Sequence, residues 1–125
     1  MRALTVRAAR PTEEDKAAAW QTVVDDRKVP VSSVALVMRA FWRPGQDDLL
    51  RPYVPRYLEL LPHLHEGGMI SSLVYSHNLF PLFAVGEEFP DQAVTAARDA
   101  APVVRKTVVE DVDELRRMLR SRASG

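Results

Sequence analysis

Apolar side chains recur at helical spacing along nearly the whole chain, and this periodicity constrains the fold more than any other feature. Six segments show it, over residues 11–26, 31–42, 48–61, 70–80, 90–100 and 101–122. In the second segment, Val34, Val37, Met38 and Phe41 stand at positions i, i+3, i+4 and i+7. An α-helix brings these positions to one face, so the pattern predicts amphipathic helices.

Capping and turn residues separate these segments. Thr12 is placed to cap the first helix. The valines of the second segment would also suit a strand, but Ser32–Ser33 favours a capped helix. Pro44–Gly45 is the clearest break, and either Gln46 or Asp47 could cap the third helix, which we expect to begin near residue 48.

Most of the predicted helices carry a stripe that we expect to face the core. The stripe of the first segment is Ala17, Trp20, Val23 and Val24, and that of the third is Leu50, Val54, Tyr57, Leu58 and Leu61. The stripe of the fourth segment is Ile70, Leu73, Val74 and His77, and that of the last is Val104, Val108, Val112, Leu115 and Leu119. Pro52 is tolerable near the start of the third helix, whereas Pro55 predicts a bend or a later start. The last helix should reach Arg122 and carries an Asp113–Arg117 pair at i, i+4.

Six helices joined by short turns predict an all-α fold. The simplest architecture is three antiparallel hairpins, as a fragment of a HEAT-like α-solenoid or as a helical bundle. No strict repeat supports the solenoid. We expect a single helical domain over residues 11–123, with an N-terminal tail or linker over residues 1–10 and a C-terminal tail over residues 124–125.

Composition excludes several classes of protein. The chain has 125 residues, of which 46% are hydrophobic and 27% charged, which is not typical of a disordered protein. Seventeen basic residues balance seventeen acidic ones, so we expect neither nucleic acid nor a membrane as a partner. The absence of cysteine excludes disulfides and thiolate chemistry. With no cysteine, the cytoplasm is the default expectation. No apolar run is long enough to span a bilayer.

The stretch "HLHEGGM" contains the only hint of a metal site. A helical zinc peptidase site needs H-E-x-x-H, but the position of the second histidine is Met69. On a helix His63 and His65 would point to opposite sides, so with Glu66 they would share a metal only in a loop. Gly67–Gly68 instead indicates that the helix ends here. We therefore assign no metal ligand.

Other polar residues each have an alternative structural interpretation. His77 could serve as a general base or ligand, but a partly buried, hydrogen-bonded histidine is favoured because no nucleophile lies at a suitable spacing. Ser32–Ser33 and Ser71–Ser72 lack a G-x-S-x-G context and read as caps or surface residues. We expect the aromatic residues Phe41, Trp42, Tyr53 and Tyr57 to pack in the core and not to line a ligand surface. We expect the basic residues at the end of the last helix, Arg116, Arg117, Arg120 and Arg122, to form a solvated face. No catalytic or cofactor-binding residue is assigned.

One segment resembles a known family. Residues 40–62 read "AFWRPGQDDLLRPYVPRYLELLP" and are similar to the C-terminal region of actinobacterial aminopeptidase N, in which an aromatic helix end runs into a P-G-Q turn, two acids, a Leu-Leu pair, P-Y-V and R-Y. The flanks "ARPTEEDKAAAWQTVV" and "RRMLRSR" extend the resemblance over residues 9–122. Pro55 and the loosely matching "SSLVYSHNLFPLFAV" depart from the family pattern.

The resemblance implies a role without an active site. That family consists of zinc metallopeptidases that remove N-terminal residues from peptides. Their catalytic motifs, H-E-x-x-H with a distant Glu and G-x-M-E-N, lie upstream of the matching region and do not occur in this chain. By resemblance, the zinc belongs to the parent enzyme, and this helical domain helps to enclose the active-site chamber.

Three hypotheses follow from the sequence. The first is the C-terminal non-catalytic domain of an aminopeptidase N-like enzyme, with the catalytic portion or a second copy as its partner and a peptide as a further candidate ligand. The alternative is a stand-alone helical adaptor that binds a protein or peptide. The third is a small enzyme that uses His77 or the His63 region.

Overall fold

The computed structural model describes residues 2–64, 68–81 and 84–124 of the chain, and these residues form helices and no strand. The α-helices are α1 (Arg2–Ala9), α2 (Glu13–Trp20), α3 (Val31–Phe41), α4 (Asp47–Leu50), α5 (Tyr53–Leu60), α6 (Met69–Asn78), α7 (Phe89–Ala97) and α8 (Pro102–Ser124). A π-helical turn, Gln21–Asp25, continues α2, and a 3₁₀ turn, Leu61–His63, continues α5. The predicted all-α class is confirmed.

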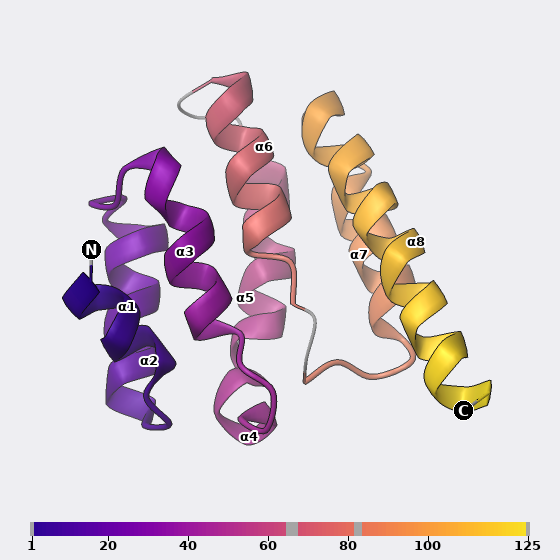
Figure 1. Ribbon diagram of the computed structural model, residues 1–125. Coiled ribbons are helices and arrows are strands. Elements are labelled where there is room, and N and C mark those ends of the chain that lie inside the picture. Colours follow the sequence, from indigo (N-terminus) through magenta and orange to yellow (C-terminus); the bar gives the residue numbers. More distant parts are fainter. Residues whose placement is uncertain (1, 65–67, 82–83, 125) are drawn as a thin grey trace.

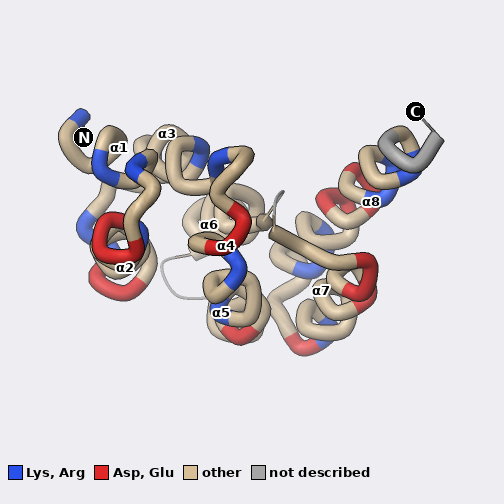
Figure 2. Tube along the Cα trace, turned by 90° about the horizontal axis from the view of Figure 1, so that it is seen from below, with Lys and Arg blue, Asp and Glu red and all other residues tan. Residues whose placement is uncertain are grey.

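The helices lie in two layers (Figures 1 and 2). One layer contains α2, α5 and α7, and the other contains α3, α6 and α8, with α1 beside α3 at the N-terminal end. Neighbours within and across the layers pack directly, notably α1 on α3, α6 on α8 and α7 on α8. The three antiparallel hairpins, and the choice between a solenoid fragment and a bundle, stay predictions.

Residues 2–9, which we expected in a tail or linker, form helix α1 instead. Ala8 is fully buried, and α1 packs on α2 and α3. The last carbonyls of this short helix find donors from elsewhere in the fold. Lys16 donates to the Ala8 carbonyl at 2.7 Å, and Gln46 donates to the Ala9 carbonyl at 3.1 Å. Tertiary contacts thus stabilise a helix that eight residues could not sustain alone.

The helix boundaries confirm some of the predicted caps and correct others. The Thr12 hydroxyl accepts a hydrogen bond from the Asp15 backbone N–H at 3.2 Å, which confirms the cap of α2. The serine cap of α3 is wrong, because Pro30 precedes a helix that begins at Val31. Ser32 and Ser33 consequently lie inside its first turn. At the other end of the chain, Ser124 ends α8 and does not begin a tail.

The third predicted helix is divided at Pro52. Helix α4 ends at Leu50, and α5 begins at Tyr53, directly after Pro52. Pro55 then falls in the first turn of α5, where the backbone N–H has no partner inside the helix in any case. The bend or later start predicted at Pro55 is therefore wrong: the helical segment begins at Asp47, near the predicted residue 48, and its break lies at Arg51–Pro52.

Aromatic side chains fill much of the core, as predicted. Two contiguous groups have ring centroids between 5.0 and 6.2 Å apart. The first group joins α2, α3 and α5, and the second joins α5, the end of α6 and α7. Their members are Trp20, Phe41, Trp42 and Tyr53, and Tyr57, Phe80 and Phe89. Edge-on and tilted contacts of this kind stabilise a core beyond the area that they bury.

The predicted stripe of α2 needs one correction. Trp20, Val23 and Val24 are buried, but Ala17 is exposed and Lys16 is fully buried in its place. The stripes of α3 and α8 face the core, apart from a partly buried Leu119.

Helix α6 is turned the other way from its prediction. Ile70 and Leu73 of its predicted stripe are exposed, whereas Ser72, Tyr75, Ser76 and Leu79 are buried. The Tyr75 hydroxyl donates to the Val23 carbonyl at 3.2 Å, which fixes this rotation of α6.

No helix among the described residues is long and apolar enough to cross a membrane.

Candidate functional site

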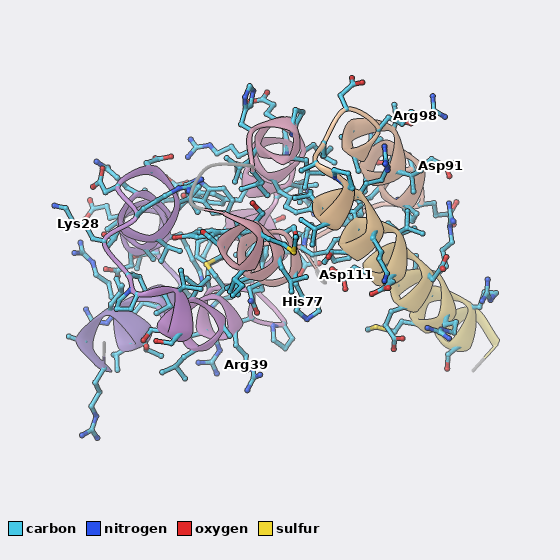
Figure 3. The ribbon with its side chains drawn as sticks, turned by 90° about the horizontal axis from the view of Figure 1, so that it is seen from above. Lys28, Arg39, His77, Asp91, Arg98 and Asp111 are labelled. Atoms are coloured by element: carbon cyan, nitrogen blue, oxygen red, sulfur yellow. The ribbon has the colours of Figure 1, made fainter. Side chains whose placement is uncertain are left out.

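A groove of about 600 Å³ opens between α3, α6 and α8. Apolar side chains form most of its wall, and charged groups stand on its two sides. Its lining residues are Ala35, Met38, Arg39, Trp42, Pro44, His77, Asn78, Phe80, Asp111, Glu114 and Met118. In Figure 3, His77 and Asp111 lie next to each other near the middle of the molecule, and Arg39 lies apart from them on the α3 side.

His77 and Asp111 form the polar centre of this groove. His77 Nδ1 lies 2.9 Å from Asp111 Oδ1 and 3.1 Å from Oδ2, so the imidazole N–H donates to a carboxylate on another helix. The His77 side chain is 63% exposed, but that of Asp111 is only 15% exposed. Burial raises the pKa of Asp111, and the hydrogen bond from His77 opposes that rise.

The groove places no hydroxyl or thiol nucleophile beside this pair. A histidine oriented by a carboxylate can act as a general base, but covalent catalysis also needs a nucleophile within reach. The groove-lining residues include no serine, threonine or cysteine. Among residues 2–64, 68–81 and 84–124, no group of three histidine, cysteine or acidic residues could hold a metal ion. The pair links α6 to α8.

Only part of the "HLHEGGM" stretch lies among the residues that the structure describes. His63 ends the 3₁₀ turn after α5 and is exposed, which agrees with the predicted helix end. Met69 begins α6. His65 and Glu66, the other two residues of the candidate metal site, lie outside the described residues.

The candidate serines and arginines take structural places. Ser72, expected as a cap or surface residue, is instead buried and donates to the Gly68 carbonyl at 2.9 Å. Ser76, which was not a candidate, is also buried and donates to the Leu73 carbonyl at 3.1 Å. Near the C-terminus, Arg116 reaches Asp91 of α7 at 2.7 Å.

The predicted Asp113–Arg117 pair is not the one that forms. Arg117 contacts Glu114 at 2.9 Å. The i, i+3 partner thus replaces the i, i+4 partner. Both spacings bring side chains together on a helix, so the sequence did not choose between them.

Lys16 is the notable residue that the sequence analysis missed. Its side chain is fully buried, and its ammonium donates at 2.7 Å to the carbonyls of Ala8 and Phe41, close to the C-termini of α1 and α3. It also lies 5.1 Å from the centroid of the Phe41 ring. Burial, reinforced by Arg43, lowers the pKa of Lys16 to about 8. Its position four residues before Trp20, on the buried face, was the available signal.

Comparison with known proteins gives one informative match. The chain is 33% identical over 129 residues to aminopeptidase N of Streptomyces lividans. The match covers 98% of this chain but only 15% of the relative's length. No family model matches the sequence, and no solved structure matches it. The chain is therefore similar to one small part of an aminopeptidase.

Proposed function

We propose that this chain is the C-terminal, non-catalytic helical domain of an aminopeptidase N-like zinc metallopeptidase that removes N-terminal residues from peptides. The observation that carries the proposal is the match along 98% of the chain to 15% of the Streptomyces lividans enzyme. The proposed role is to supply a packed helical wall that helps to enclose the active-site chamber, because enclosure excludes bulk water from the reaction.

The residues of the groove support a role without chemistry of its own. H-E-x-x-H and G-x-M-E-N are absent from the sequence, so zinc and the catalytic groups would come from the rest of the enzyme. His77 and Asp111 join two helices, and the groove supplies no nucleophile beside them. The domain would thus act through its shape and its contacts with the catalytic portion.

A graft tests this function. In the Streptomyces lividans enzyme, the segment that matches this chain is replaced by residues 2–124, and hydrolysis of an aminoacyl p-nitroanilide is measured. We expect the graft to keep activity within about tenfold of the parent and a version with the segment deleted to lose it. A matched control graft carries Phe89→Ala, which removes a buried ring from the wall. A folded graft that is as inactive as the deletion would contradict the proposal.

A further inference from the structure

The groove between α3, α6 and α8 is lined by side chains that suit a small apolar ligand. Met38, Trp42 and Phe80 are 1%, 6% and 4% exposed. Ala35 and Met118 also line the groove and are partly buried. Methionine side chains are flexible, so they can shift to fit ligands of different shape. The groove volume of about 600 Å³ lies within the roughly 300–1,000 Å³ of small-molecule sites, so the apolar part of such a ligand would fit here.

The acids on the α8 side of the groove already have partners. Asp111 accepts a hydrogen bond from His77, and Glu114 contacts Arg117 at 2.9 Å. These two are the acidic residues of the lining. The α8 side therefore offers no unpaired carboxylate to a cationic ligand.

The α3 side instead carries two donor groups without acceptors. Arg39 makes no ion pair with any residue that the structure describes. The indole N–H of Trp42 is buried, and it too has no acceptor in the described part of the chain. Arg39 and Trp42 stand at i and i+3 at the end of α3 and both line the groove, on the side of the molecule where Figure 3 shows His77. A buried N–H without an acceptor is costly, and an oxygen atom of a ligand would remove that cost.

We propose that the groove binds an amphiphile with one anionic oxygen head and an apolar tail, the chemistry of a medium-chain fatty acid. The head pairs with the Arg39 guanidinium and accepts from the Trp42 N–H. The tail lies along Met38, Phe80 and Met118. A guanidinium can donate two parallel N–H bonds to a carboxylate, which favours a carboxylate head over a neutral hydroxyl. This site is independent of the proposed role in an aminopeptidase, so its failure would leave that role untouched.

Calorimetric titration of the chain with decanoate at pH 7 tests the site. We expect decanoate to bind at least about tenfold more tightly than decanol, which has the same tail without the charge. Acetate has the same head without the tail and should bind at least about tenfold more weakly than decanoate. Equal affinities for decanoate and decanol, or for decanoate and acetate, would overturn the proposal. So would the absence of decanoate binding up to about 1 mM.

Two arginine variants separate a specific head site from general attraction of anions. Arg39→Gln and Arg43→Gln each remove one positive charge from an exposed position, but Arg43 does not line this groove. Arg39→Gln should weaken decanoate binding by about fivefold or more, and Arg43→Gln by less than about twofold. Because both positions are exposed, the comparison does not depend on repacking of the core. Equal weakening by the two variants would contradict the head site.

Ala35→Leu tests the tail site. The larger side chain narrows the groove, so it should weaken the binding of both decanoate and decanol by about fivefold or more. A thermal unfolding midpoint within about 3 °C of the parent shows that the variant is folded. A folded Ala35→Leu chain that binds decanoate as tightly as the parent would place the ligand elsewhere and overturn the proposal.

Discussion

At the scale of single residues, Lys16 is the most unusual group in the molecule. A fully buried ammonium is normally paired with a carboxylate, but the partners of Lys16 are two helix-end carbonyls and an aromatic ring. The negative end of a helix dipole favours a cation at such a place. Burial still dominates and lowers the pKa of Lys16 to about 8.

This pKa predicts how stability depends on pH. In the unfolded chain Lys16 keeps its proton up to about pH 10.5, whereas in the folded chain it releases it near pH 8. Between these values the unfolded state binds more protons, so the free energy of unfolding should rise with pH by up to about 1.4 kcal/mol per unit. Urea unfolding followed by tryptophan fluorescence between pH 7.5 and 9.5 measures the slope. Lys16→Met should flatten it, and an unchanged slope in that variant would contradict the assignment.

The His77–Asp111 pair should contribute little to stability. The imidazole is 63% exposed, so water competes for its hydrogen bond. His77→Ala should therefore lower the free energy of unfolding by less than about 1 kcal/mol. Chemical denaturation at pH 7 measures the change, with Ser32→Ala at another exposed position as the control. A loss of several kcal/mol would mean that the pair does more than join α6 to α8.

At the scale of elements, the sequence predicted which segments are helical better than it predicted which way they face. The stripes of α3 and α8 were placed correctly because their apolar residues occupy one face only. In α6 the same kind of pattern gave the wrong inner face, because periodicity shows which face of a helix is apolar but not which face packs on the core. Ser72 and Ser76 are small and bond to their own helix, so the polar-looking face could be the inner one.

The break near Pro52 and helix α1 show what local sequence signals reveal and what they miss. Prolines act through the backbone of their own segment, so the sequence predicted an irregularity in this helix, but it placed it at Pro55 and not at Pro52. The existence of α1 depends on Lys16 and Gln46, which are distant enough in sequence to leave no local pattern. The candidate groove could not be predicted from sequence either, because its lining comes from three helices whose packing depends on contacts between distant residues.

The second aromatic group predicts a large effect of one substitution. Phe89 begins α7, is 1% exposed and contacts the rings of Tyr57 and Phe80. Phe89→Ala should lower the free energy of unfolding of the isolated chain by about 3–5 kcal/mol, because it removes a buried ring and leaves a cavity. Val109→Ala on exposed surface should cost less than about 0.5 kcal/mol. Comparable costs for the two variants in urea unfolding would contradict this packing.

At the scale of the whole molecule, the helices pack in two layers, and a groove opens on one surface between α3, α6 and α8. The two layers are held together by the contact of Trp20 with Phe41, by Lys16 and by Tyr75. Ile70 and Leu73 of α6 are exposed. These features agree with the match to a small part of an aminopeptidase.

The isolated chain should accordingly have no peptidase activity. Hydrolysis of aminoacyl p-nitroanilides should stay at the level of the buffer, with or without added zinc, because the sequence has no H-E-x-x-H. The active graft described above should lose its activity on treatment with a chelator and regain it with zinc. Zinc-dependent hydrolysis by the isolated chain would contradict the account.

The most direct test of the central claim is to read the DNA immediately upstream of the codon for Met1. If the chain is one domain of an aminopeptidase N-like enzyme, the reading frame continues upstream and encodes H-E-x-x-H followed by a more distant glutamate. A stop codon and a ribosome-binding site directly before that codon would contradict the account, because the chain would then be made without a catalytic portion.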